Sequence, residues 1–155
     1  MPTASYQTRR DEIETYFDRT AADAWATLTS DAPVSRIRRT VRRGRDAMRE
    51  TLLSWLPEDL SGSTLIDAGC GTGTLAIEAA QRGAKVVAVD LSPTLVNLAR
   101  ERLRDLEDDL DVTFLVGDMR DMDLGRFDYA VAMDSIIHYD VSDGVQPLDA
   151  LAGQL

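Results

Sequence analysis

Apolar side chains in the first 56 residues recur at steps of three and four positions, a spacing that predicts amphipathic helices. The first helix is expected over residues 8–29 and the second over residues 34–56. The stretch "TSDAPVS" separates them, because Pro33 disfavours a helical conformation at Ala32. One face of the second helix carries an apolar stripe made of Ile37, Val41, Met48, Leu52 and Trp55.

After residue 63 the pattern changes to short apolar runs that alternate with helical segments. Strands are predicted for "TLIDAG", "KVVAVD", "VTFLVGD" and "FDYAVAMD". Helices are predicted for "TGTLAIEAAQRG" and "SPTLVNLARERLRDL", the second of them capped by Ser92 with Pro93 at its first position. This alternation is typical of a parallel sheet covered on both faces. We therefore expect an α/β, Rossmann-like domain over residues 61–155, preceded by a helical arm over residues 1–60.

The net charge of −10 belongs to the α/β part of the chain. The first 60 residues hold 10 basic and 10 acidic side chains, whereas the remainder holds 7 and 17. An acidic body argues against general nucleic-acid binding. The single cysteine, Cys70, favours a reducing, cytoplasmic setting, and one Cys with one His cannot build a zinc site, so no metal is expected. The N-terminus lacks the apolar centre of a signal peptide.

A glycine loop follows the first predicted strand in "LIDAGCGTG". A dinucleotide-binding loop has the pattern G-x-G-x-x-G, but here Thr74 stands where the third glycine belongs. Asp67, at the mouth of the loop, would repel a pyrophosphate and attract a cation. S-adenosylmethionine carries an ammonium and a sulfonium and has no phosphate, so the loop glycines and Asp67 favour that cofactor. The three glycines concerned are Gly69, Gly71 and Gly73.

Two further carboxylates end predicted strands. Asp90 ends the second strand and can accept both ribose hydroxyls, as an acidic residue also does in NAD sites. Asp118 ends the third strand, where it can accept from an adenine amine, and Met119 offers the ring a polarisable surface. Ligands bind at this carboxyl edge in open α/β sheets. Leu91 and Met133, which also lie close to predicted strand ends, complete the predicted cofactor site.

Together, these positions resemble the class I S-adenosylmethionine-dependent methyltransferases over residues 60–140. A longer resemblance over residues 16–139 involves three segments, "YFDRTAADAWATLTSDAPVSRIRRTVRRGRDAMRETLLSWLPEDLSG", "LIDAGCGTGTLAIEAAQRGAKVVAVDLSPTLVNLARERL" and "GRFDYAVAMDSIIHY". They are similar to the magnesium protoporphyrin IX O-methyltransferases of bacteriochlorophyll biosynthesis in photosynthetic bacteria. That resemblance implies methyl transfer from S-adenosylmethionine to one propionate of the magnesium porphyrin, giving the monomethyl ester.

The resemblance also directs attention to "DSIIHY", after the fourth predicted strand. An ionised propionate is already a nucleophile, so the reaction needs positioning and desolvation more than a strong base. We expect His138 to hydrogen-bond and orient the carboxylate, and Tyr139 to pack on the porphyrin. A structural role for each side chain is the alternative.

The second predicted helix is rich in arginine, with Arg38, Arg42, Arg45 and Arg49 along one face. A dianionic porphyrin needs a cation for its second propionate, and Arg38 and Arg42 are the expected partners. The same arginines would suit anionic lipid, which would place the protein peripherally on the photosynthetic membrane, or the preceding magnesium chelatase. A solvated basic face is the simplest alternative.

A full class I sheet has seven strands, but only four can be assigned before Leu155. We therefore expect the C-terminal strands of the family fold to be missing from this sequence. Two other functions stay open at this stage. One is another small-molecule methyltransferase, for example one acting on a quinone, and the other is a non-catalytic module that binds cofactor or porphyrin.

Overall fold

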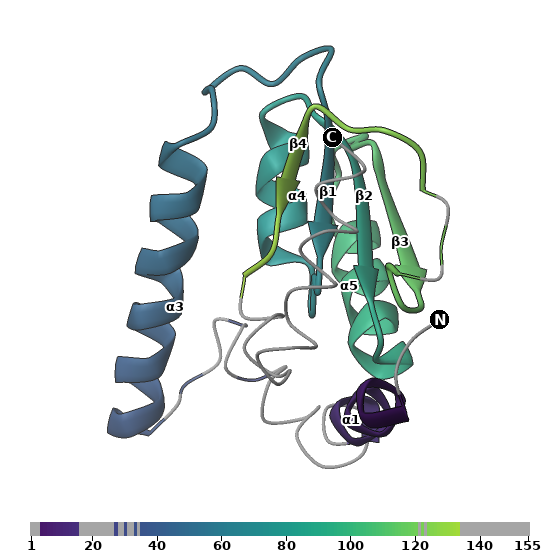
Figure 1. Ribbon diagram of the computed structural model, residues 1–155. Coiled ribbons are helices and arrows are strands. Elements are labelled where there is room, and N and C mark those ends of the chain that lie inside the picture. Colours follow the sequence, from purple (N-terminus) through teal and green to yellow (C-terminus); the bar gives the residue numbers. More distant parts are fainter. Residues whose placement is uncertain are drawn as a thin grey trace.

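The computed structural model describes residues 4–15, 27, 30, 33, 35–120, 122 and 124–133. A helical segment comes first and strands then alternate with helices (Figure 1). In chain order the elements are α1 (Ala4–Thr15), α3 (Arg36–Ser54), β1 (Thr64–Ala68), α4 (Thr74–Gln81), β2 (Lys85–Asp90), α5 (Pro93–Asp105), β3 (Val112–Val116) and β4 (Tyr129–Val131).

The four strands form one parallel sheet in the order β3-β2-β1-β4. In the central strand β1, Ile66 lies beside Val87 of β2 on one side and Ala130 of β4 on the other. The predicted α/β class with a parallel, Rossmann-like sheet is confirmed. Because all four strands run the same way, their carboxyl ends meet at one edge, which is the lower edge in Figure 1.

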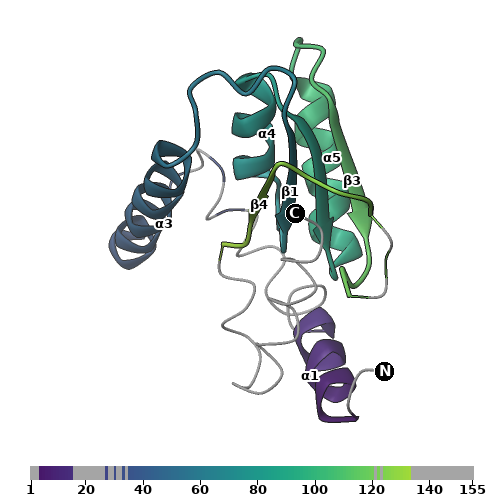
Figure 2. The same cartoon turned by 45° about the horizontal axis from the view of Figure 1, so that its top comes forward.

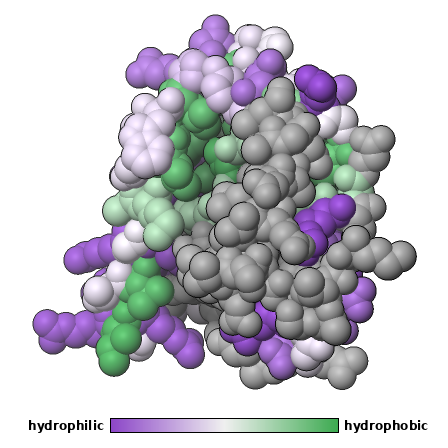
Figure 3. All heavy atoms as spheres, viewed as in Figure 1, coloured by the Kyte–Doolittle hydropathy of each residue, from purple (hydrophilic) through white to green (hydrophobic). Residues whose placement is uncertain are grey.

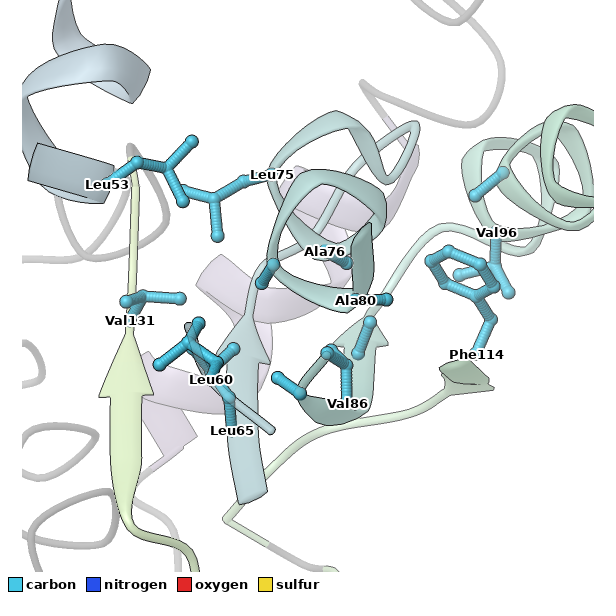
Figure 4. Packing of buried hydrophobic residues seen from close by; sticks show 14 residues of the cluster. Leu53, Leu60, Leu65, Leu75, Ala76, Ala80, Val86, Val96, Phe114 and Val131 are labelled. Carbon is cyan, nitrogen blue, oxygen red and sulfur yellow. The ribbon is translucent and has the colours of Figure 1, made fainter. Parts of the chain in front are cut away.

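Helices α4 and α5 both lie on the same face of the sheet (Figures 1 and 2). They do so because the chain moves in one direction from β1 to β2 to β3, and such crossovers are right-handed. Figure 4 shows the apolar side chains of the strands meeting those of α4 and α5. The buried residues include Leu65, Leu75, Ala76, Ala80, Val86, Val96, Phe114 and Val131.

The opposite face of the sheet has a smaller apolar cluster. Ile66 and Ala68 of β1 pack there with Phe127, and Met119 and Leu124 are partly buried against them. Cover on both faces was expected. In the described part, the segment between β3 and β4 supplies the cover on this face, whereas helices supply it on the other.

Helix α3 packs beside α4 through the end nearest β1. Leu53 is buried and meets Leu75 of α4 (Figure 4). The Nε atom of Arg49 donates to the carboxylate of Glu78 at 3.1 Å, and Nη1 of Arg82 donates to the Leu53 carbonyl at 2.7 Å. These contacts fix which side of α3 faces the domain.

Most of the apolar stripe predicted on α3 faces solvent. The exposed fraction is 79% for Ile37 and 74% for Trp55, and Val41 and Met48 are also exposed, whereas Leu52 packs partly against the core. In Figure 3 apolar and hydrophilic side chains lie side by side over α3, at the lower left. In the part of the chain that the structure describes, no helix has both the length and the apolar content needed to cross a membrane.

The expected start of the first helix is wrong. The helix was expected over residues 8–29, but α1 begins at Ala4 and runs to Thr15, and residues 16–26 lie outside the described part. The prediction followed the apolar spacing, which begins only at Ile13. The preceding residues form helix without an apolar stripe, supported by an Arg9–Glu12 ion pair of 3.2 Å one turn apart.

Candidate functional site at the carboxyl edge

Three carboxylates gather where the strands end. Asp67 is the second-to-last residue of β1, Asp90 ends β2, and Asp118 follows β3. The β2–β3 pairing continues past Asp90, whose carbonyl accepts the N–H of Gly117 at 2.9 Å. The structure therefore brings together the strand-end aspartates that the sequence singled out. Their roles in binding remain predictions.

The glycine loop bends tightly back onto β2. Gly69, Gly71 and Gly73 have φ values of 76°, 54° and 83°, in the left-handed region that favours glycine. The N–H groups of Gly69 and Cys70 both donate to the Val89 carbonyl, at 2.7 and 3.0 Å. The loop thus turns from β1 into α4 while staying attached to the neighbouring strand.

Gly73 has a second reason to be glycine. A Cβ atom at this position would lie 2.8 Å from the ring of Phe114 and 3.0 Å from the Cβ of Ala99. Gly73 also caps α4, because its carbonyl accepts the N–H of Ile77 at 2.9 Å. Its absent side chain lets α4 begin close against α5 and β3.

The Asp90 carboxylate is held by two backbone groups. Its Oδ2 atom accepts the N–H of Gly71 and its Oδ1 atom accepts the N–H of Ser92, each at 2.9 Å. Ser92 itself caps α5, as predicted, by accepting from Leu95 at 3.2 Å. A carboxylate oxygen has two lone pairs and can accept more than one donor. Asp90 can therefore accept a pair of neighbouring hydroxyls while holding the loop.

Asp67 is a buried carboxylate. Its side chain is only 2% exposed, and no hydrogen-bond donor among the described residues reaches it. Burial raises the pKa of Asp67 to about 7, and the nearby negative charge of Asp90 adds to the rise. A buried carboxylate without a partner is costly in its ionised form. A cation bound beside Asp67 would remove that cost.

Cys70, inside the same loop, is a poor candidate for a nucleophile. Burial raises the pKa of its thiol well above the ordinary value, and the charges of Asp67 and Asp90 raise it further. The reactive form of a cysteine is the thiolate, which this setting disfavours. The side chain instead packs against the main apolar cluster.

Asp118 is buried at the end of β3 and reaches an unexpected partner. Its Oδ1 atom accepts the N–H of Arg120 at 3.0 Å. Its Oδ2 atom lies 3.7 Å from Nη1 of Arg10, which comes from α1. Met119 is half-buried against the Ile66 cluster. Arg10 was not among the predicted site residues, because nothing local in the sequence indicates a contact with a residue 108 positions away.

The remaining predicted site residues lie on several elements outside the group of strand-end aspartates. Leu91 and Met133 are half-buried beside the ends of β2 and β4. On α3, the Arg38 side chain is exposed, and Nη2 of Arg42 donates to the Thr27 carbonyl at 2.8 Å. The N-terminal half of α3 points toward the same end of the molecule as the carboxyl edge (Figure 1). His138 and Tyr139, the predicted catalytic and porphyrin-packing residues, lie outside the described residues.

This geometry suits a ligand with three different polar parts. Asp67 offers a buried place for a cation, Asp90 offers acceptors for adjacent hydroxyls, and Asp118 offers an acceptor for an amine. Left-handed glycines leave the loop backbone open to close approach. No phosphate-like group would be favoured beside Asp67, since two negative charges would then share a buried space.

Comparisons with known proteins agree with this geometry. Residues 65–153 match the family described as "Methyltransferase domain". The chain is 55% identical over 144 residues to the magnesium-protoporphyrin O-methyltransferase of Rhodobacter capsulatus, covering 92% of this chain and 63% of that protein. It is 30% identical over 143 residues to the Synechocystis protein of the same name, covering 90% and 62%.

A solved structure is also similar. The crystal structure of magnesium protoporphyrin IX methyltransferase from Synechocystis PCC 6803 with bound SAM superimposes with a TM-score of 0.89 at 28% identity. The match covers 94% of this chain and 71% of that one. The chain thus spans a little under two thirds of the length of the curated relatives that it matches.

Proposed function

The chain belongs to the methyltransferase domain family, and on that premise we propose that it binds S-adenosylmethionine and takes part in methyl transfer to a propionate of magnesium protoporphyrin IX. The product would be the monomethyl ester. The identity of 55% to the Rhodobacter capsulatus enzyme supports the substrate, and the three strand-end aspartates support the cofactor. The single observation that carries the proposal is the buried carboxylate of Asp67, which no hydrogen-bond donor among the described residues reaches.

The residues present fit S-adenosylmethionine part by part. The α-ammonium of the methionine moiety would meet Asp67, directly or through water. The two ribose hydroxyls would meet Asp90, which the Gly71 and Ser92 N–H groups already orient. The exocyclic amine of adenine would meet Asp118, with Met119 against the ring. Leu91 and Met133 would line the same edge.

The cofactor and the residues of this chain would have different roles in methyl transfer. When bound, S-adenosylmethionine supplies an electrophilic methyl group on a sulfonium. The residues of this chain hold the cofactor at the carboxyl edge and exclude water from it. Methyl transfer to an anionic oxygen neutralises two opposite charges, so a poorly hydrated site favours the reaction. Positioning of the propionate is the remaining task, and we assign it to His138.

The second propionate of the porphyrin calls for a cation. Arg38 lies exposed near the start of α3, and Arg42 lies one turn further along. Guanidinium groups bind carboxylates in a bidentate manner. We assign the second propionate to these two arginines and porphyrin packing to Tyr139. Charge reversal at Arg38, with Arg104 at the far end of α5 as the matched control, tests the arginine assignment through the KM for porphyrin.

Two assays test the proposed function. Calorimetry with S-adenosylhomocysteine measures cofactor binding by the 155-residue chain. Methyl transfer from labelled S-adenosylmethionine to magnesium protoporphyrin IX is then measured for the 155-residue chain, and transfer to a quinone acceptor is measured separately. The full-length Rhodobacter capsulatus relative is the positive control. We expect binding, and labelled ester from the porphyrin alone. Transfer to the quinone alone would overturn the substrate, and binding without any turnover would make the chain a cofactor-binding module.

The role of His138 is tested in the 155-residue chain if that chain turns over, and otherwise in the same chain extended by the C-terminal strands of the class I fold. His138→Ala should lower the turnover by about 10- to 100-fold, since a positioning hydrogen bond is worth roughly 1–3 kcal/mol, and should leave cofactor affinity nearly unchanged. Complete loss of activity in a folded variant would indicate essential proton transfer. Unchanged activity would return His138 to a structural role.

We also propose that α3 contacts an anionic membrane surface. Four of the seven arginines on this helix are exposed, as are the apolar side chains of Ile37 and of Trp55, which directly follows the helix. The four are Arg36, Arg38, Arg39 and Arg43. Basic amphipathic helices of this composition bind anionic interfaces. Co-sedimentation with phosphatidylglycerol vesicles, against phosphatidylcholine vesicles, provides the test, and equal recovery with both lipids would contradict the proposal. Contact with magnesium chelatase stays a prediction from the resemblance.

A further inference from the structure

Helix α1 lies against the carboxyl edge of the sheet. In Figures 1 and 2 it is beyond the ends of β2 and β3, on the side where the strand-end aspartates lie. An ion pair between described residues joins it to the edge, from Nη1 of Arg10 to Oδ2 of Asp118 at 3.7 Å. The partner of Arg10 is therefore the residue assigned to the adenine amine.

The two side chains of this ion pair differ in exposure. The Asp118 side chain is 6% exposed, and its Oδ1 atom is fixed by the N–H of Arg120 at 3.0 Å. The Arg10 side chain is 27% exposed and also lies 3.5 Å from the carboxylate of Asp11 on its own helix. Asp118 is thus the more buried member of the pair, and Arg10 is the longer and more exposed one.

We propose that Arg10 gates the adenine end of the cofactor site, because its guanidinium pairs with Oδ2 of Asp118, the oxygen to which an adenine amine would donate. This inference rests on the proposed function, which places adenine at Asp118. Nη1 of Arg10 lies 3.7 Å from Oδ2, so an incoming amine has to share the charge of Asp118 with a guanidinium, which attracts a carboxylate more strongly than a neutral amine does. Pairing with Arg10 therefore lowers the affinity of the free protein for the adenine end of the cofactor.

The gate makes a base-specific prediction. Adenine presents an amine donor at C6, whereas hypoxanthine presents a carbonyl acceptor at the same place. The carbonyl of hypoxanthine would be repelled by Asp118 but can accept from the guanidinium of Arg10. Removing Arg10 should therefore tighten binding of the adenine compound and weaken binding of the hypoxanthine compound. A purely structural role for Arg10 would change both affinities in the same direction.

The experiment compares S-adenosylhomocysteine with S-inosylhomocysteine by calorimetry at low salt. In Arg10→Ala we expect the Kd for the adenine compound to fall about threefold and the Kd for the hypoxanthine compound to rise about threefold, as suits a partly exposed ion pair. The ratio of the two Kd values then changes by about tenfold. Arg10→Lys, which keeps the cation, should retain the wild-type ratio.

Arg9→Ala is the matched control. Arg9 is the neighbouring arginine, is exposed, and pairs with Glu12 inside α1, so its removal should leave the ratio within about twofold of wild type. An unchanged ratio in Arg10→Ala, with wild-type binding intact, would overturn the gate and leave the proposed function standing. Failure of wild-type protein to bind S-adenosylhomocysteine would overturn the proposed function itself. Equal melting temperatures for the variants would exclude a folding defect.

Discussion

The backbone N–H of Gly71 donates to Oδ2 of Asp90 at 2.9 Å, so the carboxylate that ends β2 holds the middle of the glycine loop that follows β1. The second oxygen of Asp90 accepts the N–H of Ser92, at the start of α5. One side chain thus joins the loop, the strand end and the next helix. Binding of ribose hydroxyls to Asp90 would use the same oxygens in an orientation already fixed.

Asp90→Ala should weaken binding of S-adenosylhomocysteine strongly. The change removes two charge-assisted hydrogen bonds to ribose and the support of the Gly71 and Ser92 N–H groups. We expect a cost of about 2–4 kcal/mol in binding free energy, measured as the Kd by calorimetry. Asp111→Ala is the control, since Asp111 is exposed and directly precedes β3 at the opposite edge. An unaltered Kd in Asp90→Ala would place the cofactor elsewhere on the protein.

The affinity for S-adenosylhomocysteine should depend on pH through Asp67. Burial raises the pKa of Asp67 to about 7, so in the free protein the carboxyl is mostly protonated below that pH. A bound ammonium favours the ionised form, and binding therefore releases a proton. Between pH 7.5 and pH 6 we expect the affinity to fall by about eightfold, from the change in the ionised fraction.

Asp67→Asn is the control for this pH dependence. The amide cannot titrate, so the variant should bind more weakly and with a flatter profile over the same range. The Kd is measured at half-unit steps of pH for both proteins. If wild type and variant lose affinity in parallel as the pH falls, another group is responsible and Asp67 does not face the ammonium.

The same carboxyl should lower the stability of the free protein at neutral pH. Its folded pKa of about 7 lies above the ordinary value of 3.8, so the folded state binds more protons than the unfolded state between those values. Stability therefore falls as the pH rises through this window, by up to about 4 kcal/mol for this group alone. Urea unfolding of wild type and Asp67→Asn at pH 4.5 and pH 8 measures this change in the free energy of unfolding. The variant should gain relative stability at pH 8, and a constant difference would contradict the raised pKa.

The sequence was sufficient to predict the α/β part of the fold. Continuous apolar runs such as "KVVAVD" can be stable only between layers, and Ser92 with Pro93 marks the start of α5 unambiguously. The strand-end aspartates followed from the same logic, because parallel strands bring their carboxyl ends to one edge. Local chemistry and topology agree in this region.

The N-terminal region was less predictable, for a physical reason. A helical stripe shows that a helix is amphipathic but does not show which side meets the domain. The side of α3 that faces the domain includes Leu53, because Arg49 and Arg82 hold the helix against α4 through contacts between residues distant in sequence. The Arg10–Asp118 pair is of the same kind. Such contacts depend on tertiary placement, and no local pattern encodes them.

Gly73 permits a test of how closely the loop is packed. Gly73→Ala combines two costs, a left-handed φ of 83° and a Cβ placed 2.8 Å from the Phe114 ring. The backbone contributes about 1–2 kcal/mol and the overlap about 1–3 kcal/mol, because Phe114 is buried and cannot easily move. We expect a total loss of about 2–5 kcal/mol in the free energy of unfolding, measured with urea.

Gly125→Ala separates the two costs. Gly125 has nearly the same φ, 85°, but a Cβ there would meet no atom within 4 Å. Its loss should therefore be the backbone cost alone, about 1–2 kcal/mol. Gly73→Ala should cost less in a Phe114→Leu background than in wild type, since the smaller side chain removes the ring that the new methyl group meets. If Gly73→Ala and Gly125→Ala lose equal stability, the loop relaxes away from Phe114, and crowding does not require glycine at position 73.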